Sequence, residues 1–271
     1  MVVQHNMSAL NANRQLGVTT KNLSKTTEKL SSGYKINRAA DDAAGLSISE
    51  KMRSQIKGLN KASANAQDGI SLVQTAEGAL NEAHSILQRM NELATQAAND
   101  TNTSIDRTAI QKEVDALGSE LNRIASTTQF NTQNLLDGSF TGKNLQVGAT
   151  AGQAITISIV AMSGDALSVT GLDVASFASA GSAMTKLQSA IDKISTQRSA
   201  LGAIQNRLEH TVNNLDNVAE NTQAAESRIR DADMASEMVQ YSATNIIQQA
   251  GQSMLSQANT QTQGVLSLLQ G

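Results

Sequence analysis

The chain has 271 residues and a formal net charge of −3, with no Pro, no Cys, no Trp and only 2% aromatic residues. The lack of Cys excludes a disulfide framework, a thiolate nucleophile and a Cys-based metal site. The slight negative charge and sparse aromatic residues give no nucleic-acid footprint. A chain without Pro can form long unbroken helices, and one with few aromatic residues lacks the anchors of a thick core. The composition therefore favours thin helical bundles.

Other classes of site and location are also disfavoured. No run of about 18 apolar residues indicates membrane insertion, and the first residues lack the pattern of a cleaved signal peptide. The histidines His5, His84 and His210 are far apart and form no HExxH motif, and no Gly-rich phosphate loop occurs. We therefore expect no catalytic residue, no metal site, no cofactor, no nucleic-acid partner and no membrane insertion.

The first helical pattern ends in a polar joint within residues 29–56. Lys29 suits the last turn of a helix, and Gly33 suits the left-handed position that follows it. Asp41 and Asp42 suit the N-cap and first turn of the next helix. The two acids also resemble a carboxylate pair for acid chemistry or metal binding, but helix capping explains them with fewer assumptions.

A long heptad register follows the joint. Apolar residues seven apart predict a long helix with one narrow seam, which a partner helix can approach closely. These residues are Met52, Leu59, Ala66, Val73, Leu80, Leu87 and Ala94. The polar segment 99–103 ends the pattern, and Thr103 or Ser104 can cap a shorter helix over about residues 104–124.

The second half of the chain carries a register of similar length, at Leu187, Ile194, Leu201, Leu208, Leu215, Thr222 and Ile229. Between the halves, residues 138–181 are rich in Gly. There the run 154–161 alternates like a half-buried strand, with 143–147 as its partner and 166–170 as a weaker third strand. The predicted fold is mainly α: a long antiparallel helical bundle or coiled coil formed by the N- and C-terminal regions, with a small β-rich insert in the middle.

The two ends of the chain are complementary. Residues 1–30 have a net charge of +3, residues 231–271 have −3, and residues 238–271 contain no charged side chain. A helix with an uncharged polar face suits packing against other protein on several sides. We therefore expect a terminal polymerisation seam, although spacing alone leaves a plain monomeric bundle as an equal alternative. Its residues are Leu16, Leu23, Leu30, Ile247, Ala250, Met254, Ala258, Val265 and Leu269.

Several motifs resemble those of bacterial flagellin. At the front these are KLSSGYKINRAADDAAGLSISEKMRSQI (29–56) and STTQFNTQNLLDG (126–138). At the back they are NRLEHTVNNLDNVAENTQAAESRIRDADMASEM (206–238) and QQAGQSMLSQANTQTQGVLSLLQG (248–271). The resemblance covers about four-fifths of the chain, with both ends in the correct order, and leaves out the middle.

This resemblance implies a structural subunit, not an enzyme, that polymerises into the helical filament of the bacterial flagellum for swimming motility. Residues 1–40 plus 231–271 would form a terminal coiled-coil domain in the inner filament core. Residues 41–137 plus 182–230 would form a helical rod, and residues 138–181 a small β-rich variable outer region. Gly33, Asp41 and Asp42 would then lie at the joint between two filament layers.

The resemblance also implies partners and a location. Family members are exported unfolded, so we expect a secreted protein of the extracellular filament. Its partners would be other copies of the chain in a helical homopolymer, an export chaperone at the C-terminal segment, the flagellar export apparatus and hook-associated proteins. Two alternatives remain open: a hook-associated junction protein of the flagellum and a soluble helical scaffold. The match at both ends and the simple insert favour the filament subunit.

A further partner is implied by the segment LQRMNELATQ (87–96) together with a Glu on the following helix. In many flagellins this pattern is read by the animal Toll-like receptor for flagellin. The receptor-binding candidates are Arg89 for paired hydrogen bonds, Leu93 as an apolar plug and Glu113 as a carboxylate. The plainer interpretation is that Arg89 and Glu113 only form exposed polar surface and that this surface packs between filament subunits.

Overall fold

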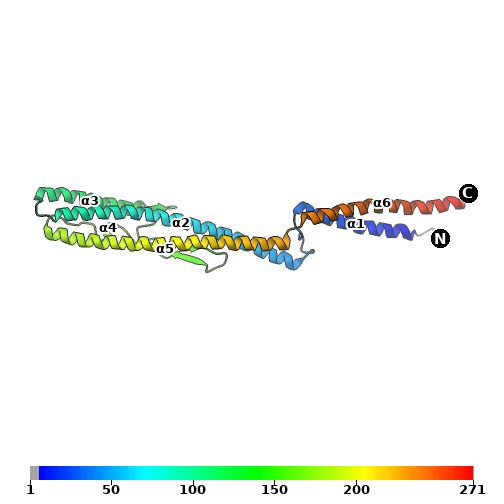
Figure 1. Cartoon of the computed structure of the whole chain (residues 1–271), viewed down its shortest axis with the longest axis horizontal. Helices are drawn as coiled ribbons and strands as arrows, with labels where there is room; N and C mark the ends of the chain where they lie inside the picture. The colour runs from blue at the N-terminus through cyan, green and yellow to red at the C-terminus, as the bar shows by residue number, and fades with distance from the viewer. Residues whose placement is uncertain (1–5, 271) are drawn as a thin grey trace. The chain divides into compact units, whose positions relative to one another are not determined.

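The computed structural model describes residues 6–270 and the side chains of residues 6–261. The described chain is mainly helical, with four short strands near its middle (Figure 1). The predicted mainly α fold with a small β-rich middle is therefore confirmed. The elements are α1 (Met7–Ser32), α2 (Ala43–Ala97), α3 (Ser104–Thr127), β1 (Gln129–Phe130), β2 (Gln133–Asn134), β3 (Lys143–Gln146), β4 (Ala154–Ile157), α4 (Gly164–Leu167), α5 (Phe177–Arg230) and α6 (Met234–Gln270).

The chain divides into two compact units, of which the first comprises residues 1–54 and 221–271 and the second residues 55–220. The division falls inside α2 and α5, whereas the sequence predicted boundaries near residues 40 and 231. Residues 138–181, expected as a separate outer region, belong to the second unit. None of the described helices combines the length and the hydrophobicity needed to cross a membrane.

The second unit is built on the two heptad registers. The α2 seam is buried from Leu59 to Ala94, and on α5 the matching positions from Leu187 to Leu215 are buried. Leu59 packs in one cluster with Leu215, and Ala66 in another with Leu208, so the two helices run antiparallel. Large and small residues alternate along the seam, which allows the helices to interlock closely. The predicted antiparallel bundle is confirmed here.

A short turn reverses the chain between α2 and α3. The Thr103 hydroxyl accepts from Asp106 N at 3.3 Å, and the Asp106 carboxylate accepts from Thr103 N at 2.9 Å. This reciprocal capping box satisfies two backbone donors at the start of α3. Arg107 Nε donates to Ala97 O at 3.0 Å and so ties the start of α3 to the end of α2.

The β-rich middle consists of two antiparallel hairpins. In the first, β1 pairs with β2 through a two-residue turn in which Asn131 and Thr132 have φ of 48° and 64°. The sequence analysis missed this hairpin because strands of two residues leave no alternating pattern. In the second, β3 pairs with β4 and Leu145 lies opposite Ile155, as the sequence predicted.

The prediction of a third strand at residues 166–170 is wrong, because the structure has no strand there. The first two residues of this segment, Ala166 and Leu167, instead end the short helix α4, which starts because the Ser163 hydroxyl accepts from Ala166 N at 3.4 Å. Ser168 has a φ of 62° and ends it, and its N–H donates to Asp165 O. Local Ser side-chain bonds thus compete with a strand ladder, which is a general property of Ser.

Candidate functional site

The terminal helices α1 and α6 run side by side and antiparallel in the first unit (Figure 1). Asn6 Nδ2 donates to Ala258 O at 2.8 Å at one end of the pair, and Lys29 Nζ donates to Glu237 Oε1 at 2.7 Å at the other. The less exposed residues of α1 recur every three or four positions: Ala9, Ala12, Leu16, Thr19, Leu23, Thr26 and Leu30. Those of α6 do the same: Tyr241, Thr244, Gln248, Gly251, Leu255 and Ala258.

Small residues set how closely these two helices approach. A Cβ on Gly251 would lie 3.4 Å from Leu16 Cδ1, so the glycine accommodates this leucine. Thr26 is 4% exposed, and its hydroxyl donates to Asn22 O at 2.8 Å within its own helix. The inner face of the pair therefore consists of small and polar residues around a few leucines.

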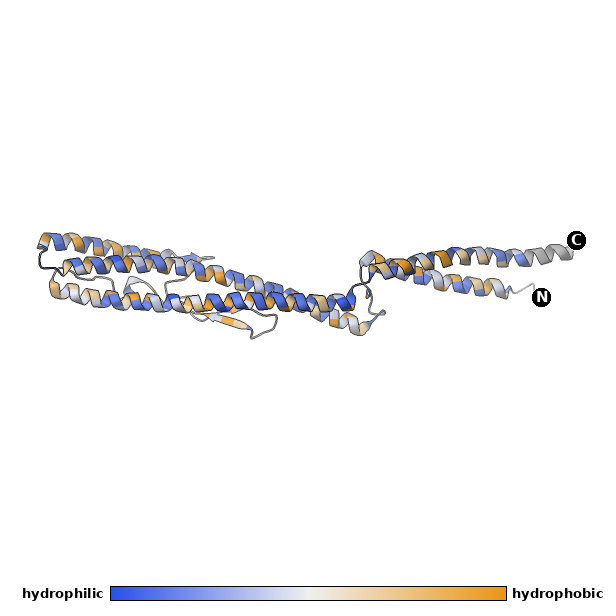
Figure 2. Cartoon of the chain, viewed as in Figure 1, coloured by the Kyte–Doolittle hydropathy of each residue, from blue (hydrophilic) through white to orange (hydrophobic). Residues whose placement is uncertain are grey.

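The largest apolar residues of α6 lie on another face, exposed to solvent. Val239 is 72% exposed, Ile246 68%, Ile247 57% and Met254 64%. Figure 2 shows hydrophobic residues concentrated along the first half of α6, with more polar residues between them. With spacings of three, four or seven residues these four exposed residues share one stripe, to which the exposed Ala250 also belongs. We call Val239, Ile246, Ile247, Ala250 and Met254 the outer stripe of α6.

The residues of the expected seam therefore lie on two surfaces. Leu16, Leu23, Leu30 and Ala258 are on the inner faces of the pair, whereas Ile247, Ala250 and Met254 are on the outer stripe. The side chains of Val265 and Leu269 lie outside the described residues. The helical spacing of Thr244, Gln248 and Gly251 is the signal that sequence analysis overlooked, because its members are not large apolar residues.

The terminal pair ends at a joint in which two helix breaks face each other. Gly33 has a φ of 75° and its N–H donates to Lys29 O at 2.8 Å, which terminates α1. Tyr34 forms an antiparallel bridge with Asp231, just after α5 ends. Lys35 N donates to Arg230 O at 2.7 Å, and Ala232 N donates to Gly33 O at 3.0 Å. The two links thus satisfy each other's backbone groups.

Two guanidinium groups lie over the Tyr34 ring at this joint. Arg230 Cζ is 4.7 Å from the ring centroid and Arg53 Cζ is 5.7 Å from it. Both distances fall within the range of cation–π attraction. Arg53 also pairs with Glu226 at 3.1 Å, and Glu226 is only 8% exposed. Tyr34 therefore connects the link after α1 to the first turns of α2 and to the end of α5.

Asp42 and Asp41 have different roles in the same joint. Asp42 precedes α2 and its Oδ1 accepts from Gly45 N at 2.9 Å, which is N-cap geometry. Asp41 instead closes the loop before it: its Oδ2 accepts from Arg38 N at 3.1 Å and Asn37 N at 3.4 Å. The bond from Arg38 N is the main cause that lowers the pKa of Asp41, and Lys25 at 3.6 Å adds to it.

One apolar residue fills the joint. Ile36 is 3% exposed, and a Cβ on Gly45 would lie 2.8 Å from its Cδ1 and within contact distance of Asp42 Oδ2. A side chain at position 45 would therefore collide with both Ile36 and the capping carboxylate. This close approach explains why glycine stands in the first turn of α2 despite its low helix propensity.

The receptor candidates lie on α2 and α3 of the second unit. Arg89 Nε and Nη2 both bond Glu113 Oε1, at 3.1 and 3.0 Å, and Arg89 Nη1 bonds Glu92 at 3.2 Å. The Arg89 and Glu113 side chains remain 53% and 46% exposed. Leu93 is 2% exposed and belongs to the core, so the expected apolar plug is not on the surface of this unit. The side chains of Arg89 and Glu113 thus form a polar surface patch.

The described residues contain no cluster of three or more His, Asp and Glu side chains that could hold a metal ion. His84 bonds Gln88 Nε2 at 3.0 Å, His210 is exposed, and His5 lies outside the described residues. Asp41 and Asp42 are both engaged with backbone N–H groups, as helix and loop caps are. The surfaces that stand out among the described residues are the outer stripe of α6 and the joint.

Comparisons with known proteins identify the two helical regions of the chain. Residues 3–141 match the bacterial flagellin N-terminal helical region, and residues 184–269 match the bacterial flagellin C-terminal helical region. A flagellin of Halalkalibacterium halodurans is 54% identical, covering 99% of this chain and 100% of the relative. A flagellin of Bacillus subtilis is 49% identical with the same coverage of both chains.

A solved structure shares part of the fold. The crystal structure of Bacillus cereus flagellin has 35% identity and a TM-score of 0.52, covering 56% of this chain and 88% of the solved one. The solved flagellin thus shares the fold over somewhat more than half of this chain.

Proposed function

The chain belongs to the bacterial flagellin family, a family of structural filament proteins, and we propose that it polymerises through α1 and α6 into the helical filament of a bacterial flagellum. Such a filament lies outside the cell and turns motor rotation into swimming. The proposal makes the terminal helix pair the polymerising element, and it makes the joint the connection between that pair and the bundle helices.

The outer stripe of α6 is the observation that carries this proposal. Four of its residues, Val239, Ile246, Ile247 and Met254, are more than half exposed in the single chain. Burying one such side chain stabilises a complex by roughly 1.5–3 kcal/mol before ordering costs. Residues 238–271 have no charge that would favour solvent over protein contact. The single chain thus leaves an apolar surface that other copies would cover.

The two faces of the terminal pair imply how copies would join. The inner face of α6 is already occupied by α1, so the outer stripe is the apolar face of this helix that remains for another copy. Contacts between unlike surfaces that do not close into a ring generate an open helical fibre. A filament therefore requires that the stripe meets a different surface of the next copy, as the proposed function of this family member demands.

A charge placed on the outer stripe tests the proposal. Ile247→Asp should prevent filament growth, because a carboxylate would then have to be buried without a partner. Gln249→Asp places the same charge on the same helix away from the stripe and should still polymerise. Electron microscopy and sedimentation of purified monomer would measure both. Normal filaments from Ile247→Asp would contradict the proposal.

The same assay separates the filament subunit from the two alternatives. Long filaments on reannealing after mild heating are expected of a flagellin, whereas a hook-associated junction protein would stop at short assemblies. Deletion of residues 238–271 should abolish polymerisation. If the deletion left the assembly state unchanged, the chain would be a soluble scaffold.

Export partners are part of the same proposal. The uncharged apolar face of α6 would need shielding before secretion, which suits a cytoplasmic export chaperone that binds the C-terminal segment. We expect calorimetry to show chaperone binding by the full chain and none by a chain ending at residue 237. Equal binding by both chains would place the chaperone elsewhere. The export apparatus and hook-associated proteins are further partners that this function requires.

The patch of Arg89 and Glu113 supports a second candidate function, binding of the free monomer by the animal Toll-like receptor for flagellin. Its exposed guanidinium could exchange the Glu113 pairing for a receptor carboxylate or carbonyl. Leu93, four residues after Arg89 on α2, is buried in the core and would act by holding this part of the helix in place. In the filament, the plainer alternative is that the patch packs between subunits.

A matched pair of substitutions tests receptor binding. Arg89→Ala should lower receptor signalling by the monomer about tenfold or more, as expected for loss of an Arg hot spot. Arg123 forms an equally exposed pair with Glu120 on α3, so Arg123→Ala is the control. Equal signalling by the two variants would reject the role of Arg89. The monomers should have the same thermal stability, since both pairs are solvent-exposed.

A further inference from the structure

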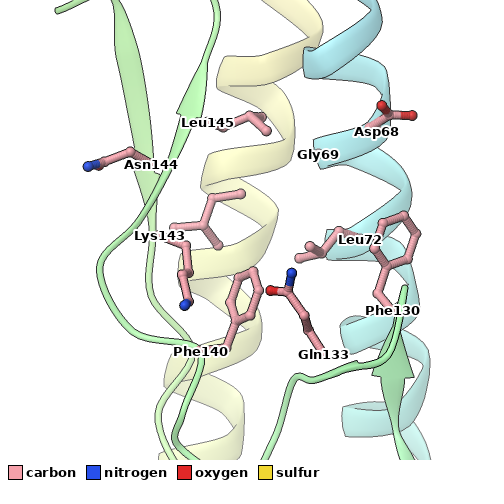
Figure 3. A pocket seen from close by; sticks show the side chains of 10 residues that line it. Asp68, Gly69, Leu72, Phe130, Gln133, Phe140, Lys143, Asn144 and Leu145 are labelled. Atoms are coloured by element: carbon pink, nitrogen blue, oxygen red, sulfur yellow. The ribbon is translucent and has the colours of Figure 1, made fainter.

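A hollow of about 370 Å³ opens in the second unit between the two hairpins and α2 (Figure 3). Its apolar lining is Leu72, Phe130, Phe140, Leu145 and Ile157. Phe140 and Ile157 are buried, at 6% and 2% exposed, so their side chains form a rigid base of the hollow. Since an apolar cavity of about 150 Å³ accepts a benzene ring, this hollow has room for an aromatic side chain.

Lys143 gives the hollow a charged rim. Its Nζ lies 6.0 Å from the centroid of the Phe140 ring, and the side chain is exposed. It is the only charged residue between positions 138 and 160. Asp68 also lines the hollow, but its carboxylate points away from the centre (Figure 3). The rim beside the hairpins is therefore positive.

Phe177 is a suitable occupant. It is the first residue of α5 and is 63% exposed, although the chain contains only three Phe. The segment 161–185 around it carries Asp165 and Asp173 and no Lys or Arg. Asp173, four residues before Phe177, is exposed. An exposed aromatic residue beside an acid thus faces solvent, complementary in shape and charge to the hollow beside Lys143.

Phe177 cannot fill the hollow of its own chain. Val174, three residues before α5, donates from its N to Gln111 Oε1 of α3 at 2.8 Å. Arg107, one helical turn before Gln111, donates to Ala97 O at the end of α2. The start of α5 therefore lies near the end of α2. At a rise of about 1.5 Å per residue, Ala97 lies about 38 Å along α2 from Leu72 at the hollow. Only a second copy, displaced along the bundle, could bring its Phe177 to this position.

We propose that Phe177 of one copy inserts into the hollow between the hairpins of the next copy, with Asp173 placed beside Lys143. This inference rests on the proposed function, since it requires a homopolymer. Each copy carries the side chain at one place and the hollow at another, so the contact repeats in one direction without closing. It adds a lateral contact between bundles to the contacts of the terminal helices.

Cross-linking tests the contact directly, because the natural chain has no Cys. A chain with both Phe177→Cys and Gln133→Cys, polymerised and treated with diamide, should give a ladder of covalent multimers on a non-reducing gel. Gln133 lines the hollow, and a disulfide needs the two Cα atoms within about 7 Å. The control pairs Phe177→Cys with Glu82→Cys, which lies about 15 Å farther along α2 than Leu72, and should give none.

Energetic coupling provides a second readout. Phe177→Ala should raise the critical concentration for elongation about tenfold. Val160→Ala, at another residue that is about half exposed, should leave it unchanged. Lys143→Asp should raise it about threefold, and adding Asp173→Lys should restore it. Because these four positions are exposed, the substitutions should leave the thermal unfolding of the monomer unaltered.

The outcomes separate this contact from filament formation itself. Wild-type filaments without a ladder from the Phe177–Gln133 pair, together with normal elongation by Phe177→Ala, would overturn the contact and leave the proposed function standing. Failure of the wild-type chain to form filaments would overturn the proposed function.

Discussion

Lys29 of α1 and Glu237 of α6 form an ion pair with 2.7 Å between Nζ and Oε1. The Glu237 side chain is only 12% exposed, and among the described residues its second carboxylate oxygen has no hydrogen-bond partner and is buried. The carboxylate therefore depends on Lys29 for compensation of its lost hydration. The pair joins the terminal helices at the end where they meet the joint.

Removal of Lys29 should loosen the terminal pair. We expect Lys29→Met to destabilise it by about 1–3 kcal/mol, because Glu237 is left partly buried without its main partner. Lys21→Met, at an exposed position of the same helix, should change little. Protection of α1 amides from hydrogen exchange would measure the difference. Equal protection in both variants would show that the ion pair of Lys29 and Glu237 contributes nothing to the stability of the terminal helices.

The ring of Tyr34, and not its hydroxyl, should hold the joint. Tyr34→Phe keeps an aromatic ring for Arg230 and Arg53 to contact and should be nearly neutral. Tyr34→Leu removes the cation–π attraction and should cost about 1–2 kcal/mol. Chemical denaturation of the monomer would compare the two. Similar losses of stability in both variants would show that the hydroxyl group, and not the ring, holds the joint.

Two glycines of the terminal helices should respond oppositely to leucine. Gly17→Leu should raise the stability of α1 by about 0.5–1 kcal/mol, since a Cβ there meets nothing within 4 Å and leucine favours helix. Gly251→Leu has the same propensity gain but must displace Leu16 and should separate the helices. Thermal unfolding followed by circular dichroism distinguishes them. If Gly251→Leu were stabilising, α1 and α6 would not approach each other closely at this glycine.

The loop before α2 should loosen in acid. The backbone N–H bonds lower the pKa of Asp41 in the folded chain below its value in the unfolded chain. Its contribution to stability is therefore fully present above the unfolded value, about 3.9, and is lost as pH falls through the lower folded value. Carboxyl NMR titration should place the Asp41 midpoint below that of a model peptide. Asp41→Asn should remove this part of the pH dependence.

Much of the bundle could be predicted from the sequence because its signals are local and repeated. The seam from Leu59 to Ala94 has the heptad spacing that a helix imposes whatever its partner. Gly33 lies at a helix end and Asp42 at a helix start for equally local reasons: backbone conformation and a cap of a few residues. Asp41 has the same residue type, yet it closes the preceding loop, because its neighbours Asn37 and Arg38 fold back over it.

The β-rich middle was only partly predictable. The pair of β3 and β4 shows alternation over enough residues to be recognised, whereas the turn at Asn131 and Thr132 lies between strands of two residues. The segment after Ser163 carries apolar spacing suited to either structure. A single hydroxyl cap decided for the helical turn, and only the folded context shows that decision.

The sequence by itself determined that this protein has long helices, a C-terminal segment free of charge, and the motifs of the flagellin family. Only the tertiary structure decided which face of α6 meets α1 and which face remains open. Gln248 and Gly251 lie inside while Ile247 and Met254 lie outside, although hydrophobicity alone predicts the reverse. The physical reason is close approach: small residues admit the neighbouring helix, and the larger apolar side chains are left for contact with other copies.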